Sequence, residues 1–90
     1  MKIKLKGQWD DQRIWLNEKE LFPDKSFKHR IHSPDGFAWG YAGSGPSQLA
    51  LAICLELYDQ RKALSDYMNF KFKYLTILPM EDFETEIEIK

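Results

Sequence analysis

The sequence has little of several things, and each shortage excludes a class of protein. Its single cysteine, Cys54, rules out a disulfide within the chain. No apolar run reaches the roughly 18–20 residues that a membrane span requires. Thirteen basic residues against 14 acidic ones give a net charge of −1, so the basic surplus of a general nucleic-acid binder is missing. The N-terminal segment Met1–Lys6 lacks the apolar core of a signal peptide. We therefore expect a cytoplasmic protein without nucleic-acid or membrane partners.

The composition is that of one folded globular domain. With 43% hydrophobic and 14% aromatic residues, the chain is far from the aromatic-poor, highly charged profile of disordered proteins. Its 90 residues leave no room for a second domain. A chain of this length buries roughly 60–65% of its unfolded surface, so the core is modest. We treat residues 1–90 as a single domain.

Alternation of charged and apolar residues predicts strands at both ends of the chain. Lys2–Gln8 places three lysines on one face, and Phe83–Ile89 places three glutamates on one face. Opposite charges across neighbouring strands contribute about 0.2–1 kcal/mol per pair, which favours adjacent pairing. The alternative is two separate edge strands, each protected by its charges. Arg13–Leu16 is predicted to form an antiparallel hairpin with the first strand, and Asn17–Glu20 then turns the chain.

The middle of the chain predicts two further strands joined by a turn. A third strand is indicated by alternation from residue 27 to residue 32: Phe27, His29 and Ile31 alternate with Lys28, Arg30 and His32. Ser33–Gly36 has the proline and glycine of a type I turn. Phe37–Ala42 is predicted as a fourth strand with aromatic side chains on one face and small residues on the other. The aromatic face is interpreted as core, with an outward interaction patch as the alternative.

Two consecutive helices are predicted in the second half. The first runs from Pro46 to about Tyr58, with Gly45 as its cap, and its first half is apolar all round, as in a central buried helix. Asp59 is expected to cap the second, which ends before Pro79; a single bent helix is the alternative. The predicted fold class is α+β, an antiparallel sheet of four or five strands with two consecutive helices packed on one face.

The loop Gly43–Gln48, which leads into the first helix, is the best candidate for a binding site. A helix N-terminus offers unpaired amides and partial positive charge, which attract anions, and glycines let successive amides turn toward one ligand. The loop matches neither the Walker pattern nor the dinucleotide fingerprint. The alternative is a tight turn with a purely structural cap. The predicted ligand-binding residues combine this loop with nearby cationic and aromatic side chains: Arg30, His32, Trp39, Tyr41, Gly43, Ser44, Gly45, Ser47 and Gln48.

No set of residues predicts a metal or catalytic centre. His29 and His32 are three apart on a predicted strand, so they face opposite sides, and no further ligand completes a metal site. His32, Asp35 and Ser44 are the residue types of a hydrolase triad, but the chain has no nucleophile elbow. We therefore expect no metal, no cofactor and no enzymatic activity.

Three further residues are interpreted as structural. Cys54 lies in the apolar helix and is expected to be an inert packing residue. Lys71 and Lys73 are placed on the solvated side of the second helix, opposite its apolar residues. The alternative for either lysine is a role in binding phosphate.

The glycine-rich middle of the chain resembles the core of an uncharacterised family of small proteins found in bacteria, phages and plasmids. The matching motifs run from His32 to Pro79: His-Ser-Pro-Asp-Gly-Phe, Trp-Gly-Tyr, Gly-Ser-Gly-Pro, Gln-Leu-Ala-Leu-Ala-Ile, Phe-Lys and Leu-Pro. Ala42 departs from the glycine more common there. The family has no known activity, so no functional residue carries over. The resemblance implies an accessory protein of a mobile element, such as one that opposes host defence.

We expect a non-enzymatic protein that sequesters a phosphate-bearing ligand, such as a nucleotide or nucleotide-derived defence signal, in a homo-oligomer. If phage-encoded, it acts in the host cytoplasm. The alternative is a protein–protein inhibitor or adaptor that contacts a host defence protein through Phe37, Trp39 and Tyr41. A small hydrolase that uses Ser44 and His32 is a third class.

Overall fold

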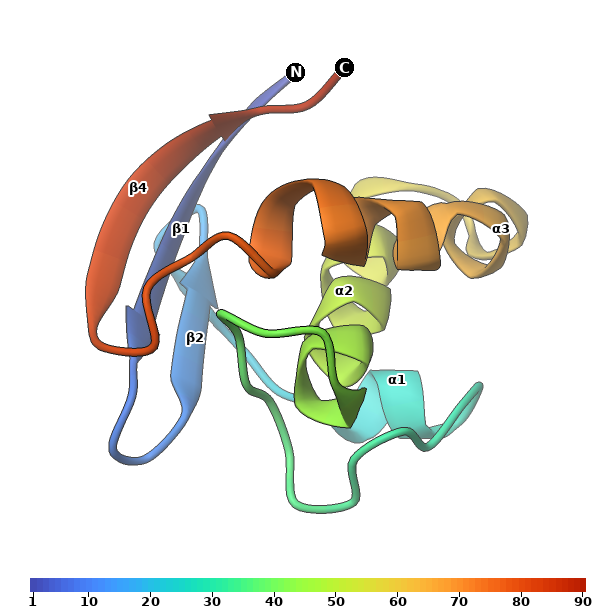
Figure 1. The fold of residues 1–90 in the computed structure, drawn as a ribbon. Helices are drawn as coiled ribbons and strands as arrows, with labels where there is room; N and C mark the ends of the chain where they lie inside the picture. Colours follow the sequence, from blue (N-terminus) through green and yellow to red (C-terminus); the bar gives the residue numbers. More distant parts are fainter.

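The computed structural model describes residues 1–90 as a four-stranded antiparallel sheet with helices on one face (Figure 1). The strands are β1 (Lys2–Gln8), β2 (Arg13–Leu16), β3 (Lys19–Leu21) and β4 (Phe83–Glu88). The helices are α1 (Asp24–Phe27), α2 (Ser44–Leu57), α3 (Gln60–Phe70) and the π-helix η1 (Lys71–Leu75). The predicted α+β class is confirmed. None of these helices is long and apolar enough to cross a bilayer.

The two ends of the chain pair with each other in the sheet, whose order is β3-β2-β1-β4. Along β1 and β4 the three lysines lie opposite the three glutamates: Lys2 with Glu88, Lys4 with Glu86, and Lys6 with Glu84. The predicted adjacent pairing is confirmed, and the alternative of two separate edge strands is wrong because β1 is central. The charged rows face outward, whereas the apolar residues of β1 face the helices and are buried.

The expected strand at Phe27–Ile31 is wrong, because this segment ends helix α1 and then continues without regular structure. Ser26 donates through Oγ to the Pro23 carbonyl at 2.6 Å, and the amides that follow bond back to residues 23–26. Local side-chain bonds of this kind compete with strand pairing. The third strand is instead β3, since Asn17 and Glu18 both adopt positive φ and make a two-residue hairpin turn.

The expected strand at Phe37–Ala42 is also wrong. Gly40 adopts a φ of +84°, which interrupts an extended chain, and its amide donates to the Leu75 carbonyl at 2.9 Å. Phe37, Ala38 and Trp39 are all buried, so successive side chains do not alternate between a buried face and an exposed face. The turn before it is confirmed, since the Gly36 amide donates to the Ser33 carbonyl at 3.1 Å. The aromatic residues at 37 and 39 join the core, as the main interpretation predicted.

The two long helices follow the prediction with small shifts. Helix α2 begins two residues earlier than expected, and its cap is Gly43 and not Gly45. Asp59 caps α3 as predicted, through an Oδ1 that accepts from the Lys62 amide at 2.8 Å. Because Tyr58 and Asp59 are extended, the alternative of one bent helix is wrong. Helix α2 is buried along most of its length between the sheet and α3, and it forms the centre of the core.

Candidate functional site

The start of α2 is a helix N-terminus without a side-chain cap. Gly43 is extended, and the Ser47 side chain bonds to the Gly43 carbonyl at 3.1 Å instead of to an amide. Pro46 has no amide hydrogen, so the amides of Ser44 and Gly45 are the donors of the first turn that remain to be satisfied. Ser44 is exposed, whereas Gly45 is buried. The Ser44 amide is therefore the one at the surface, open to solvent or to a ligand.

A buried lysine reaches this helix start from η1. Lys71 is only 5% exposed, and its Nζ donates to Ser47 Oγ at 2.9 Å and to the Gly43 carbonyl at 3.4 Å. The same ammonium lies 4.5 Å from the centre of the Phe72 ring. Lys71 takes part in none of the ion pairs of the chain. A buried positive charge is thus held by neutral oxygens and a ring, without a carboxylate to balance it.

The interpretation of Lys71 as a solvated residue is wrong, whereas Lys73 is exposed as predicted. The sequence contained a signal for this. Lys71 lies in one row of four-residue spacing with three buried residues of the same helical stretch: Ala63, Tyr67 and Leu75. The π-helical turn continues this row toward α2, and such turns are frequent at functional sites.

His32 is a second basic residue beside the helix start. Its Nε2 lies 2.8 Å from the Tyr67 hydroxyl, and its ring is half-buried. Burial lowers the pKa of His32, and the positive charges of Lys71 and Arg30 lower it further. His32 is therefore held in its neutral form at neutral pH. Besides burial, the charges that act on His32 are those of Lys71 and Arg30, both positive.

Gln48 is part of the scaffold, so its prediction as a ligand-binding residue is wrong. Its Oε1 accepts from the amides of His32 at 2.7 Å and Ser33 at 3.1 Å. Its Nε2 donates to Ser26 Oγ at 2.7 Å and to the Arg30 carbonyl at 3.0 Å. Two acceptor positions and two donor hydrogens complete the capacity of the amide. Gln48 therefore ties the loop after α1 to helix α2 and has nothing left for a ligand.

The prediction of Trp39 as a ligand-binding residue is also wrong. It is fully buried, its Nε1 donates to the Glu81 carbonyl at 3.2 Å, and its ring packs edge-on against Trp9 and Phe83 with centroids 5.3 Å apart in both pairs. A β-carbon at position 7 would lie 2.8 Å from this indole, so Gly7 makes room for it. The indole is a core element and cannot stack on a ligand.

Tyr41 lies over the glycines at the start of α2. A β-carbon on Gly43 would collide with the Tyr41 ring, and one on Gly45 would lie 2.6 Å from the Ala38 side chain and 3.2 Å from the Tyr41 hydroxyl. Both glycines are therefore needed for close approach. Tyr41 itself is 41% exposed. Of the predicted aromatic neighbours, it is the one available to a ligand.

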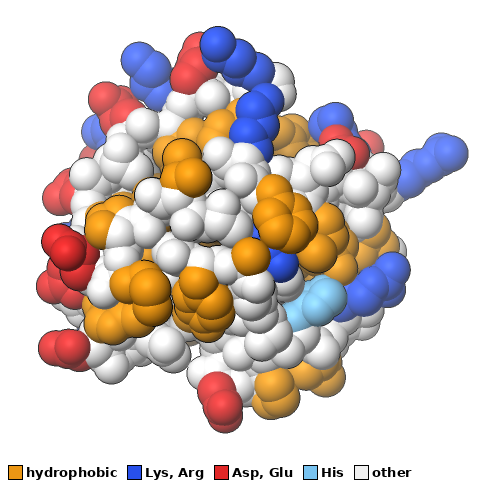
Figure 2. All heavy atoms as spheres, in the orientation of Figure 1, with side chains coloured by type: hydrophobic (Ala, Val, Ile, Leu, Met, Phe, Trp, Pro, Cys, Tyr) orange, Lys and Arg blue, Asp and Glu red, His pale blue; other side chains and the backbone are white.

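Exposed hydrophobic side chains come from the segments beside this helix start. Figure 2 shows them gathered on the face that carries the start of α2 and η1 in Figure 1, with a histidine and a basic side chain beside them. Four exposed residues of the segments before α2 and after α3 are called the apolar rim: Tyr41, Phe72, Ile77 and Met80. A β-carbon on Gly40, next to Tyr41, would lie 2.7 Å from Met80 Cγ, which shows how close the two loops are.

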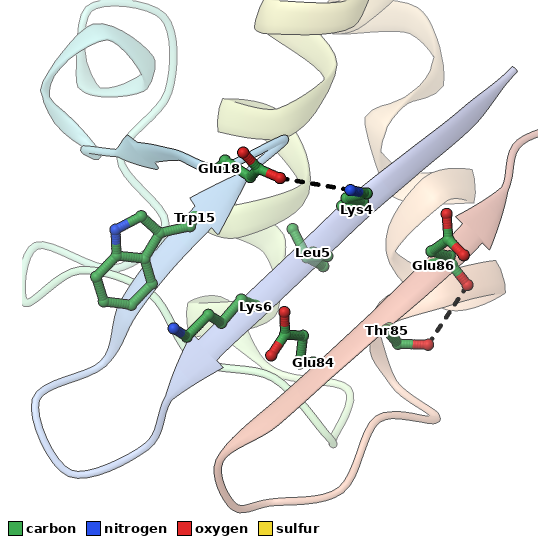
Figure 3. Close-up of a pocket in the computed structure, with 8 residues that line it drawn as sticks. All are labelled: Lys4, Leu5, Lys6, Trp15, Glu18, Glu84, Thr85 and Glu86. Carbon is green, nitrogen blue, oxygen red and sulfur yellow. Dashed lines mark hydrogen bonds and ion pairs between the residues drawn. The ribbon is translucent and has the colours of Figure 1, made fainter.

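The principal hollows of the molecule lie away from this site. A hollow of about 700 Å³ lies on the outer face of the sheet, where Lys6 points toward Trp15, and Lys4 bonds to Glu18 at 3.4 Å (Figure 3). Neither this hollow nor the next three includes a residue of Gly43–Gln48. The helix start is thus not part of any of these four hollows. No group of three or more His, Cys, Asp or Glu residues is placed to hold a metal ion.

The structure thus brings together most of the predicted site residues. His32, Tyr41, Gly43, Ser44 and Ser47 lie at or beside the start of α2, as do the main chains of Gly45 and Gln48. The Arg30 side chain is exposed and bonds to the His29 carbonyl at 3.3 Å. Sequence reasoning assigned too little to Lys71 and missed Tyr67.

Comparisons with known proteins identify the family of the chain. A family model described as "Family of unknown function (DUF6166)" matches residues 5–90, and the chain belongs to this family. No curated protein and no solved structure matches the chain. The family carries no described activity, so any function has to be argued from the geometry.

Proposed function

For this member of a family of unknown function, we propose a non-enzymatic protein that binds a phosphate-bearing ligand, such as a nucleotide, at the start of α2. The observation that carries the proposal is the burial of Lys71 against Ser47 and Gly43 without a carboxylate partner. An ammonium in this setting has lost water and gained only neutral oxygens. An anion bound beside Ser47 and Gly43 supplies the negative charge that Lys71 has no partner for.

The helix dipole adds to the attraction for an anion. The N-terminus of α2 carries roughly half a positive charge, which disfavours a cation such as Lys71 but favours an anion beside it. At an effective dielectric constant of 20, a unit negative charge about 4 Å from the ammonium gains about 4 kcal/mol before its own desolvation. The amide of the exposed Ser44 supplies a hydrogen bond to a phosphate oxygen.

The apolar rim supports a ligand that has a flat body as well as a phosphate. Tyr41 lies against the glycines that begin α2, and the Phe72 ring lies 4.5 Å from the Lys71 ammonium. Both rings are partly exposed. A base that stacks on an aromatic ring gains about 1–3 kcal/mol in single-strand binders. A nucleotide combines the two kinds of group that this surface recognises.

Binding without turnover is proposed because the hydroxyl and imidazole groups are engaged elsewhere. Ser47 Oγ bonds to Gly43 and Lys71, and His32 Nε2 bonds to Tyr67. No serine is hydrogen-bonded to a histidine, which is the pairing that serine nucleophiles use. Sequestration of a defence signal by a mobile-element protein belongs to this proposal. So does a homo-oligomer, since a second copy would enclose the site.

The proposal is tested by titrating inorganic phosphate, adenosine monophosphate and a cyclic dinucleotide into the protein while its thermal unfolding is measured. A ligand at 100 times its dissociation constant stabilises the fold by about 2.7 kcal/mol. Lys71→Met keeps an unbranched side chain and removes the charge, and it should abolish the stabilisation. The Ser47 hydroxyl retains its bond to the Gly43 carbonyl in this variant, so the helix start should stay folded.

The matched control is Lys73→Met, an equal charge change at an exposed position two residues away. It should leave the response to ligand intact. Equal responses of wild type and Lys71→Met, or no response of the wild type to any of the three probes, would contradict the proposal. Chromatography of the incubated nucleotides should show them unchanged.

A second candidate is a protein–protein inhibitor or adaptor that uses the apolar rim, with a host defence protein as its proposed partner. Its supporting observation is that Ile77 is 77% exposed and Phe72 55% exposed. Because Phe37 and Trp39 are buried, they are excluded as anchors of such a patch. A Phe72→Ser, Ile77→Ser double variant should abolish this contact. The Lys71→Met variant should leave it intact.

A further inference from the structure

The free edge of the sheet is formed by β4, and its properties differ from those of the opposite edge. Strand order places β4 at one end of the sheet and β3 at the other. β4 has six residues and β3 has three. In Figure 1 β4 forms the outer margin of the sheet, with β1 on its inner side. An edge strand of this length presents, on its free side, a row of backbone donors and acceptors. Extended segments of other chains can pair with them.

The apolar face of β4 is only partly covered. In β1, which has neighbours on both sides, Ile3 is 1% exposed and Leu5 is fully buried. Their partners in β4, Ile87 and Thr85, face the same core but are only half-buried. The difference follows from the missing neighbour on the outer side of β4. One more strand with apolar residues on the inner face would complete the coverage.

The outer face of β4 carries a row of negative charges. Glu84, Glu86 and Glu88 are exposed, and none of them takes part in an ion pair within the chain. The lysine row of β1 lies in register with them, but Lys4 bonds to Glu18, and Lys6 lies 5.4 Å from the centre of the Trp15 ring (Figure 3). The glutamates are therefore available to positive charges on a strand added at the outer edge.

We propose that the edge of β4 binds an extended segment of another protein, with basic residues at alternate positions and apolar residues between them. β1 shows the chemistry that β4 accepts, because it sets Lys2, Lys4 and Lys6 opposite the three glutamates. A second copy of this chain does not fit. Two-fold pairing of β4 with itself sets Glu against Glu on the same face, which is destabilising.

The test adds two peptides to the full chain and follows its backbone amides by NMR. The first peptide has the sequence of β1, Lys-Ile-Lys-Leu-Lys-Gly-Gln, and the second has glutamate in place of its three lysines. The basic peptide should shift amides of Phe83–Glu88 in a saturable way, and the acidic peptide should not. Amides of β2 should stay in place, because β2 lies on the far side of β1.

The triple variant Glu84→Gln, Glu86→Gln, Glu88→Gln should weaken binding of the basic peptide roughly 3- to 100-fold, given the range for cross-strand charge pairs. If that variant unfolds, Glu86→Gln alone should weaken it by a smaller factor. Glu81→Gln, the same charge change just before β4, is the control and should bind as the wild type does. Three results would overturn the proposal: no shift with the basic peptide, equal shifts with both peptides, or shifts in β2 that indicate strand exchange.

Discussion

Replacement of Gln48 by leucine should destabilise the fold strongly, because this one neutral side chain makes several buried hydrogen bonds. Gln48 is fully buried, and it makes four hydrogen bonds to the segment between Ser26 and Ser33. A neutral hydrogen bond contributes about 0.5–1.5 kcal/mol net, so the four together contribute about 2–6 kcal/mol. Leucine has a similar volume, and the loss therefore reports the bonds and not a cavity.

The expected loss is a large part of the total stability, which is about 5–15 kcal/mol for a domain. For a chain of this length, each kcal/mol lowers the melting temperature by about 4–8 °C. Urea unfolding followed by circular dichroism gives the free energy of unfolding directly. Hydrogen exchange should also show that the amides of His32 and Ser33 lose protection, since both donate to Gln48 Oε1.

The matched control is Gln60→Leu, an equal substitution at an exposed position, which should change the free energy of unfolding by less than about 0.5 kcal/mol. A loss below about 1 kcal/mol in Gln48→Leu would refute the reasoning. It would mean that water replaces all four bonds at little cost. In that case the segment from Ser26 to Ser33 would not depend on α2 for its position.

Two further predictions concern pH and the backbone. Because the pKa of His32 is lowered below its usual 6.5, the unfolded chain binds more protons, and this part of the stability is complete above about pH 6.5 and is lost as the pH falls. In His32→Gln that loss below about pH 6.5 should disappear from urea unfolding curves. Gly40→Ala should cost more than about 1–2 kcal/mol, because φ is +84° and the new β-carbon would lie 2.7 Å from the Leu78 carbonyl. Gly36→Ala, at φ +113° with open space around it, should cost less by thermal unfolding, and equal costs would contradict the steric argument.

The features that the sequence predicted correctly are those that local patterns determine. The end strands follow from strict alternation of charge, and their pairing follows from opposite charges at the same period. The Asp59 cap and the break before α3 are likewise local. The fold class required no more than these elements and the apolar first half of α2.

The middle of the chain was mispredicted because tertiary contacts decide its structure. Residues 27–31 alternate by coincidence, and the bonds to Gln48 hold the loop in an irregular path. Residues 37–42 pass beside the core, where Gly40 bonds to η1 and Trp39 reaches the segment before β4. The partners Gln48, Leu75 and Glu81 are all distant in sequence from the residues they contact, so no local pattern predicts these contacts.

The candidate site was predicted in position but not in its main charge. The Gly-Ser-Gly-Pro loop indicated a helix start correctly, whereas the lysine that reaches it comes from 28 residues after Gly43. Lys71 was assigned by its charge to the solvent side, although its spacing matched the buried row. The spacing predicted the burial of Lys71 better than its charge did, because the long side chain lets the ammonium group reach the start of α2.

The pairing of β1 with β4 also affects how fast this chain can fold. The Ile89 amide bonds to the Met1 carbonyl at 2.7 Å, so the sheet joins segments that are far apart in the sequence. Contacts between such distant residues slow folding, because the whole intervening chain has to be closed into a loop first. Until Phe83–Glu88 have been synthesised, Ile3 and Leu5 lack a neighbour on one side. Removal of β4 should therefore leave this side of β1 open permanently and make the chain prone to aggregation.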